Sequence, residues 1–333
     1  MVAAAIEQPT SMKAIVHERY GRPEVLHFGD VDRPEPTDDT VVVRVRAAAF
    51  NKLDWYEISG APLLVRPMMG GLLRPKSNLV GHDFAGTVEA VGKDVDDLEP
   101  GDEVFGAAAG ACAEYVRART GQVAPKPRNL GFEESAAAPI AGLTALQGLR
   151  DHAGLEPGQS VLVNGASGGV GTFAVQIAKA LGAEVTAVCS TQNVEQARAL
   201  GADHVIDYTR DDVSRSGRRF DVVFHVGGRM SWSRCKRVLR PKGKVVLAGA
   251  SGNRLLGPLG YMGRVKLASL ASSRDAVFFV AKFNRPDLDA LRELMESGRV
   301  RPVVEKVYAL DEAPDALRRL GEGHARGKLV ISV

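Results

Sequence analysis

The segment VLVNGASGGVGTFAVQIAKALGA, residues 161–183, restricts the fold of this chain more than any other part of its sequence. Val161, Leu162 and Val163 are β-branched or bulky and predict a buried parallel strand. After the glycines, apolar residues recur at helical spacing and predict one apolar helix face: Val170, Ala174, Ile177, Ala178 and Leu181. The chain must therefore turn sharply from a buried strand into a helix within residues 165–171.

This glycine-rich turn predicts a dinucleotide site. Glycine has no Cβ, so it permits a tight turn and lets a ligand approach the backbone closely. The unpaired N–H groups at the start of the following helix favour an anion such as a pyrophosphate. Three glycines in a strand–turn–helix setting strengthen that prediction. We expect the cofactor to contact Gly165, Ser167, Gly168, Gly169, Val170 and Gly171.

Downstream of this unit, predicted strands and helices alternate with short connections. Strands are expected at residues 185–188, 204–207, 221–226, 244–248 and 276–280. Helices are expected at residues 193–200 and from the fourth strand through Arg240. Such alternation is typical of a doubly wound parallel sheet, and we place this nucleotide-binding domain at residues 131–300.

The first 130 residues predict a different, β-rich domain. Short strands are expected near residues 12–16, 84–91, 103–105 and 113–117, and the alternation of Val and Arg within residues 41–46 predicts a half-exposed strand. Strand-like residues 303–310 and 328–333 flank a predicted helix at 314–320. We therefore expect residues 301–333 to return to the domain of residues 1–130. Two domains leave a cleft between them, and such clefts are favoured ligand sites.

Composition narrows the possible partners and compartments. The chain has 333 residues and a formal net charge of +3 that is mixed along its length, which argues against a nucleic-acid partner. Three widely spaced cysteines do not make a disulfide framework and fit a reducing cytosol. The first residues lack the features of a signal peptide, and no apolar run is long enough to span a membrane. We expect a cytoplasmic protein without a membrane partner.

Four further motifs resemble a known superfamily. GHDFAGTVEAVGKDV (81–95), PGDEVFG (100–106), GLTALQGL (142–149) and GKLVISV (327–333), together with the glycine-rich turn, resemble the medium-chain dehydrogenases/reductases. Within that superfamily the chain is similar to the zinc-independent quinone oxidoreductases, including the ζ-crystallin-like enzymes. The resemblance covers nearly the whole chain. It implies an α/β fold with a GroES-like β-rich catalytic domain and a Rossmann domain, and a homodimer that shields residues 276–281.

The same resemblance predicts where zinc ligands would lie in the sequence, so their presence can be checked. Zinc enzymes of this superfamily supply a cysteine after the first long strand, a histidine in a GHE motif, and another cysteine or acid. Here AFNKLDW has no cysteine, and Gly81-His82-Asp83 keeps only the histidine. One histidine does not make a tetrahedral zinc site, and the four clustered cysteines of a structural zinc lobe are missing from the sequence. We expect no metal, with His82 as a hydrogen-bonded side chain beside the cleft.

Without zinc, the chemistry left is hydride transfer from a reduced nicotinamide to a quinone or an α,β-unsaturated carbonyl. FNKLDWYEISG (50–60) resembles the segment of quinone reductases that lines the cleft. This implies Asn51 and Tyr56 as the catalytic polar residues, because an amide N–H or a phenol O–H can polarise a carbonyl oxygen. A packed aromatic residue is the alternative for Tyr56, and Asp54 and Trp55 are interpreted as structural.

Residues beside the nicotinamide are also implied by the resemblance. Thr144 corresponds to a threonine near the carboxamide, and Ala248, Gly249 and Ala250 would let the nicotinamide ribose lie close to the backbone. Val226, which precedes Gly227 and Gly228 after the fourth strand, is a further expected cofactor contact. His225 stands where relatives usually carry Asp, and we interpret it as a contact behind the ribose, with a proton donor as the alternative. Residues 63–75, with Met68 and Met69, are either an apolar rim of the substrate pocket or an ordered surface loop.

The end of the second strand bears on cofactor choice. Residues 187–193 carry no acid to accept from a ribose 2′-OH. Their hydroxyl and amide groups can instead donate to a 2′-phosphate, so we expect NADPH rather than NADH, bound by Ser190, Thr191 and Asn193, with Tyr208 added by the resemblance. The family often has Lys or Arg in this loop and this chain does not, so Arg210 is the candidate to compensate. An enoyl-thioester reductase and a non-enzymatic NADPH-binding, redox-sensing protein remain the alternatives.

Overall fold

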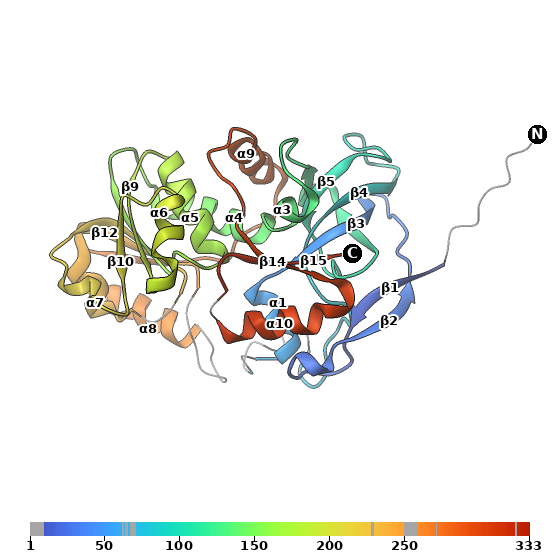
Figure 1. Ribbon diagram of the computed structural model, residues 1–333, viewed down its shortest axis with the longest axis horizontal. Coiled ribbons are helices and arrows are strands. Elements are labelled where there is room, and N and C mark those ends of the chain that lie inside the picture. Colours follow the sequence, from blue (N-terminus) through green and yellow to red (C-terminus); the bar gives the residue numbers. More distant parts are fainter. Residues whose placement is uncertain are drawn as a thin grey trace, which may run out of the picture.

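Two large sheets form the two ends of the molecule in the computed structural model (Figure 1). The structure describes residues 10–61, 63, 66, 71–227, 230–249, 259–270, 272–323 and 325–333. A separate two-stranded sheet, β1 (Ser11–Val16) and β2 (His27–Asp32), lies beside the larger β-rich sheet. In the described residues, no helix is long and apolar enough to cross a membrane.

The six-stranded sheet is parallel throughout, with strand order β10-β9-β8-β11-β12-β13. Its strands are β8 (Ser160–Asn164), β9 (Glu184–Cys189), β10 (His204–Asp207), β11 (Phe220–His225), β12 (Leu239–Leu247) and β13 (Asp275–Phe278). The strand order reverses between β8 and β11, and ligands of doubly wound sheets bind beyond the carboxyl ends of strands at such a point. The doubly wound sheet predicted from the sequence is confirmed.

Helices cover this sheet. They are α4 (Pro139–Gln147), α5 (Gly169–Ala180), α6 (Val194–Ala199), α7 (Trp232–Val238), α8 (Leu259–Ser269) and α9 (Arg285–Glu296), with a π-helical turn at Gly148–Ala153 after α4. The expectation that the helix after the fourth predicted strand, α7, runs through Arg240 is wrong. Leu239 already pairs with Phe220 of β11, so the sheet ends that helix at Val238.

The seven-stranded sheet contains β3 (Thr40–Phe50), β4 (Asp83–Val91), β5 (Glu103–Ala107), β6 (Tyr115–Arg119), β7 (Val123–Pro125), β14 (Val304–Ala309) and β15 (Lys328–Ser332). The half-exposed strand predicted within residues 41–46 is wrong in part. Val42 is buried like Val41 and Val43, between Ala90 of β4 and Arg117 of β6, and the exposed side chains in this stretch are Arg44 and Arg46.

The C-terminal segment packs among the N-terminal elements (Figure 1). β15 pairs antiparallel with β3, placing Leu329 opposite Phe50. Helix α10 (Ala313–Glu322) packs on α1 (Lys52–Ser59) so closely that a Cβ on Gly321 would lie 2.3 Å from the Trp55 ring. Just before β15, Gly327 forms an isolated parallel bridge with Gly168 of the glycine-rich turn. The segment that ends the β-rich sheet therefore also touches the nucleotide-binding sheet's loop.

Candidate active site

The glycines of the turn have different tasks. Gly165 has φ +94° and a Cβ there would lie 2.8 Å from the Gly227 nitrogen, while a Cβ on Gly171 would lie 2.0 Å from the Gly165 oxygen. Both are therefore required by the fold itself. Gly168 has φ −81°, and the nearest atom to its added Cβ is the Gly165 oxygen at 3.9 Å. Gly168 thus keeps open a space that the fold does not use.

Helix α5 begins beside that space, at Gly169. The amide groups of a first helical turn have no partner inside the helix, and they carry the positive end of its dipole. Ser167, Gly169 and Val170 are each partly exposed there. The turn therefore presents donors and open space together, as a pyrophosphate requires.

The expected adenosine end lies after β9. Ser190 and Thr191 begin the 3-10 turn Thr191–Asn193, and Tyr208 is exposed at the end of the neighbouring β10. Asn193 is buried, and its Nδ2 donates to Ser190 Oγ at 3.0 Å. The structure thus places Asn193 behind Ser190, where it orients the serine hydroxyl.

An acid stands closer to this loop than the sequence indicated. β10 pairs with β9 so that Asp207 lies opposite Cys189. Thr191 Oγ1 consequently donates to Asp207 Oδ2 at 2.6 Å, and this bond is the largest cause that lowers the pKa of Asp207. Arg210 lies with Nε 3.6 Å from the same oxygen, so it pairs with Asp207.

The loop after β9 has no Lys or Arg of its own, but the C-terminal segment supplies a positive charge next to it. Arg326 is exposed, and its Nη2 donates to Gln192 Oε1 at 2.8 Å. Its neighbour Gly327 is bridged to Gly168. A guanidinium thus lies beside the loop that is predicted to bind the 2′-phosphate. Sequence reasoning missed Arg326 because it is 134 positions from Gln192.

The strand ends at the expected nicotinamide side form a small polar network. Asn164 Nδ2 donates to the Gly227 oxygen at 2.8 Å and to His225 Nδ1 at 2.7 Å. His225 is fully buried and accepts with Nδ1, which leaves its ring proton on Nε2. A Cβ on Gly249 would lie 2.8 Å from the Val226 oxygen, and Val226, Ala248 and Gly249 are partly exposed around this close approach.

Helix α4 contacts both α5 of the nucleotide-binding domain and β4 of the β-rich domain. Thr144 is partly buried, and its hydroxyl donates to the Ile140 oxygen at 2.7 Å within the helix. The Ile140 N–H donates to Asp83 Oδ1 at 3.0 Å, which ties the start of α4 to β4. The start of the helix that carries Thr144 is thereby fixed relative to β4.

Asn51 belongs to a buried cluster with Asp83 and Lys328. Its Nδ2 donates to Asp83 Oδ2 at 2.8 Å, and Lys328 Nζ donates to Asn51 Oδ1 at 2.6 Å and to Asp83 Oδ2 at 2.9 Å. All three residues are at least nine-tenths buried. Burial raises the pKa of Asp83, while the charge of Lys328 opposes that rise. The Asn51 amide is thus engaged with protein atoms and serves to fix the β3–α1 junction.

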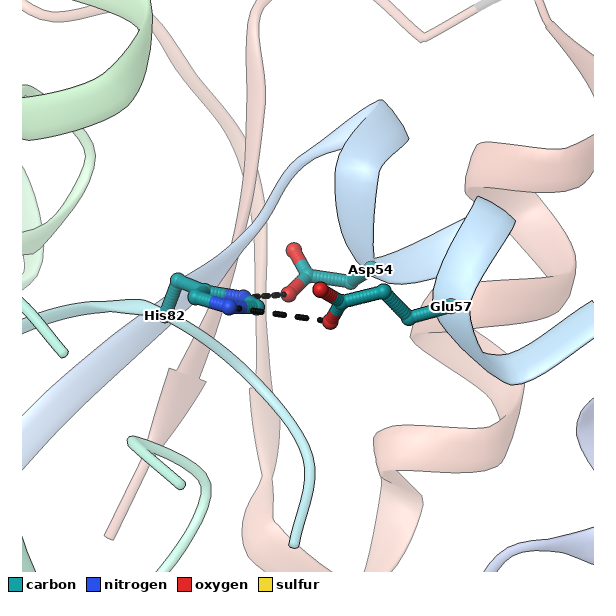
Figure 2. A group of neighbouring side chains, drawn as sticks. All are labelled: Asp54, Glu57 and His82. Carbon is teal, nitrogen blue, oxygen red and sulfur yellow. Dashed lines mark hydrogen bonds and ion pairs between the residues drawn. The ribbon is translucent and has the colours of Figure 1, made fainter. Parts of the chain in front are cut away.

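A second cluster joins α1 to His82 (Figure 2). Asp54 Oδ2 accepts from the Asn51 backbone N–H at 2.5 Å, and its Oδ1 lies 2.7 Å from His82 Nδ1. Glu57 Oε2 lies 3.6 Å from His82 Nε2. Burial by itself would lower the pKa of His82, but the hydrogen bond and charge of Asp54, helped by Glu57, outweigh it and raise this pKa to about 9.

His82 and Tyr56 line one cavity of the β-rich domain. Its wall also includes His17, Tyr20, Glu57, Arg66, Lys76 and Leu79. Burial raises the pKa of Tyr56, and within the described part of the chain no hydrogen bond engages its hydroxyl. The predicted rim residues Met68 and Met69, and the small residues Gly228 and Ala250 after β11 and β12, lie outside the described residues.

The cluster of Asp54, Glu57 and His82 does not fit a catalytic zinc ion. One ligand atom of each lies within 4.8 Å of the others. However, Asp54 contacts Nδ1 and Glu57 faces Nε2, and one ion binds only one nitrogen of a given ring. An ion at Nε2 would keep two protein ligands, whereas catalytic zinc keeps three. Cys112 is not among the described residues whose ligand atoms come together here, so it adds no third ligand.

Sequence reasoning missed the residues that connect these groups. Lys328 was visible only as part of a motif, and its link to Asn51 spans 277 positions. Asp54 was interpreted as structural, although it holds both Asn51 and His82. A signal for Asp54 was present, since an acid three residues after a helix cap commonly accepts from the cap's backbone N–H.

Comparison with known proteins supports the organisation seen here. A family model described as "Alcohol dehydrogenase GroES-like domain" matches residues 37–193, and one described as "Zinc-binding dehydrogenase" matches residues 200–331. Quinone-oxidoreductase QR1, chloroplastic, of Triphysaria versicolor is 33% identical over 96% of this chain and 98% of its own. The 2-methylene-furan-3-one reductase of Solanum lycopersicum is 33% identical over 99% of this chain and 81% of its own.

Solved structures agree with these relatives. The quinone oxidoreductase from Coxiella burnetii matches with a TM-score of 0.86 and 32% identity, covering 97% of this chain and 99% of that one. The Escherichia coli quinone oxidoreductase complexed with NADPH matches with a TM-score of 0.81 and 27% identity, covering 96% and 100%. The chain belongs to the quinone oxidoreductases of the medium-chain dehydrogenase/reductase superfamily and is an oxidoreductase.

Proposed function

We propose that this protein is an NADPH-dependent reductase that transfers hydride to quinones or α,β-unsaturated carbonyl compounds without zinc. One observation carries the proposal: the predicted pyrophosphate loop and the Tyr56 cavity are joined by a short chain of contacts. A Cβ on Gly169 would lie 3.1 Å from Lys328 Cδ, and Lys328 Nζ bonds Asn51. The Asn51 backbone bonds Asp54, which holds His82 at the cavity.

These contacts suggest a role for each group of residues in the proposed reaction. A bound reduced nicotinamide supplies the hydride. The first turn of α5 binds the pyrophosphate at the space beside Gly168, and the loop at Ser190 and Thr191 binds the adenosine phosphate. Tyr56 donates a hydrogen bond to the acceptor oxygen, where negative charge develops. Asn51, held by Asp83 and Lys328, keeps the β3–α1 junction in register with that oxygen.

NADPH is proposed over NADH on the charges at the loop. Arg326 supplies the positive charge that residues 187–193 lack, and Arg210 offsets the carboxylate of Asp207. The acceptor class is supported by the tomato relative, whose name describes an enone-type substrate. Two further proposals are independent of the reaction. We propose that the protein is cytoplasmic, because its three cysteines are free and buried. We also propose that it forms a homodimer through edge strand β13, after which Val280 is exposed.

Steady-state kinetics test the function directly. Quinones, enones and enoyl thioesters should be offered with NADPH and with NADH, and metal content measured on the same sample. We expect turnover of quinones or enones with NADPH, at a metal content far below one zinc per chain. Preference for enoyl thioesters would instead identify the biosynthetic alternative. Light scattering should give a species of twice the 35.5 kDa chain mass.

A further inference from the structure

The cavity of the β-rich domain contains one side chain suited to deliver a proton. We propose that His82 is the general acid of the reduction and that its Nε2–H protonates the acceptor oxygen, with Asp54 as the positioning residue. This inference rests on the proposed function, which requires a proton as well as a hydride. The geometry carries it: Asp54 Oδ1 holds Nδ1 at 2.7 Å, so the ring is fixed with Nε2 toward Glu57 on the cavity wall (Figure 2).

The step balances without another reactant. The acceptor gains a hydride, which leaves the electron pair of its former C=O π bond on oxygen. The Nε2–H bond of His82 then breaks and an O–H bond forms, so the imidazolium becomes a neutral imidazole. An enone gives the enol, which tautomerises to the ketone, and a quinone gives the hydroquinone. Glu57, one-third exposed at the cavity, lies 3.6 Å from Nε2 and can pass a solvent proton back to the ring.

Charged groups around His82 favour the protonated ring before the reaction. Asp54 and Glu57 face it from α1, and Asp83 follows it on β4. Burial lowers its pKa, but the hydrogen bond of Asp54 and the charges of all three acids raise it to about 9. Arg66 and Lys76 lie on the cavity wall with the opposite charge. The ring therefore enters the reaction as a cation and loses its charge as the oxyanion is neutralised.

Other donors on the cavity wall are less suited to give up a proton. Tyr20 donates its hydroxyl to the Gly71 oxygen at 2.7 Å, and Arg66 donates from Nε to the Gly60 oxygen at 2.8 Å. Burial lowers the pKa of His17, which keeps that ring neutral near pH 7. Burial raises the pKa of Tyr56, so its phenol orients the oxygen but holds its proton. Lys76 is exposed to solvent, so among the described wall residues His82 is the proton donor that a partner holds in place.

The test compares His82→Gln with a matched histidine elsewhere. His204 Nε2 lies 3.1 Å from Glu184 Oε1 at the far edge of the nucleotide sheet, so His204→Gln also breaks a histidine–carboxylate pair. Single-turnover reduction of an enone by NADPH should be followed from pH 6 to 10, with NADPH binding and thermal unfolding measured on each variant. General acid catalysis is worth about 10²–10⁴-fold, so His82→Gln should slow turnover by about 100-fold or more while still binding NADPH.

The pH profile distinguishes a proton donor from a merely structural residue. The wild-type rate should fall as pH rises through about 9, and His204→Gln should keep this limb. His82→Gln should lose it, and Asp54→Asn should move it to lower pH because one negative charge is removed. If the limb persists in His82→Gln, or if its rate equals that of the wild type, the acid is another group. If the wild type reduces no acceptor, the proposed function itself fails.

Discussion

Arg326 donates a hydrogen bond to the side-chain oxygen of Gln192 at 2.8 Å, and so links the segment before the last strand to the loop after β9. Gln192 is neutral, and the bond leaves most of the guanidinium's donors free for another acceptor. A 2′-phosphate on the adjacent Ser190 and Thr191 would be such an acceptor. If NADPH binds as proposed, both lobes of the molecule would contribute to the site of its 2′-phosphate.

Replacing this arginine should change cofactor choice. We expect Arg326→Gln to weaken NADPH binding by roughly 10- to 100-fold, because hydrogen bonds between charged groups are worth about 1.5–3 kcal/mol. NADH binding should change little, since it lacks the 2′-phosphate. Fluorescence titration with both nucleotides measures the effect, and Arg318→Gln on exposed α10 is a matched control. Equal loss for both nucleotides would place Arg326 on the pyrophosphate instead.

The acid beside Thr191 should act in the opposite direction. Asp207→Asn removes a negative charge next to the predicted phosphate, so NADPH should bind more tightly, with NADH unchanged or weaker. Conversely, Ser190→Asp adds an acid there and should reduce the ratio of NADPH to NADH efficiency by at least about tenfold. The ratio of kcat/KM for the two nucleotides reports both changes. An unchanged ratio in both variants would show that the 2′-phosphate does not bind at this loop.

Two glycines of the turn should respond differently to a side chain. Gly168→Val extends into open space at an ordinary φ, so we expect a folded protein that no longer binds NADPH. Gly171→Ala puts a Cβ 2.0 Å from the Gly165 oxygen and should destabilise the fold. Thermal unfolding and nucleotide titration on both variants separate these effects. Normal NADPH affinity in Gly168→Val would show that the turn has no ligand there.

The buried ion pair should be costly to break. Lys328→Met leaves Asp83 without its cation in a buried place, and such changes cost about 3–5 kcal/mol of unfolding free energy. Lys179→Met breaks the partly exposed pair with Asp203 and should cost at most about 1 kcal/mol. Urea unfolding of both variants makes the comparison. Similar losses would mean that the cluster around Asn51 is not specially sensitive.

His82 should also make stability depend on pH. Its pKa rises from 6.5 in the unfolded chain to about 9 in the fold, so folding favours the protonated ring. That stabilisation is complete below pH 6.5 and is lost as pH rises through about 9, to a total of up to about 3 kcal/mol. The difference in unfolding free energy between wild type and His82→Gln should shrink over this range. A constant difference would contradict the raised pKa.

The sequence predicts those features whose residues are adjacent in the chain and not those formed by distant segments. The glycine-rich turn was predictable because its strand, turn and helix are adjacent in the chain, so one short segment contains the whole pattern. The burial of Val42 was not, because the strands that flank it, β4 and β6, come from much later in the chain. The roles of three further residues could not be predicted for a related reason: Arg326, Lys328 and Asp207. Their contacts depend on how distant segments pair, and the residues next to them in the sequence give no sign of that pairing.

The bridge between Gly168 and Gly327 has a consequence for how the protein melts. In proteins with two lobes, the lobes often unfold in separate transitions, the less stable lobe first. Here the lobes share residues 326–328, which contact the glycine-rich turn through Gly327 and Asn51 through Lys328. Melting either lobe therefore removes a partner of the other. Calorimetry should show one cooperative transition, and NADPH should shift all of it upward, including the part due to the β-rich lobe.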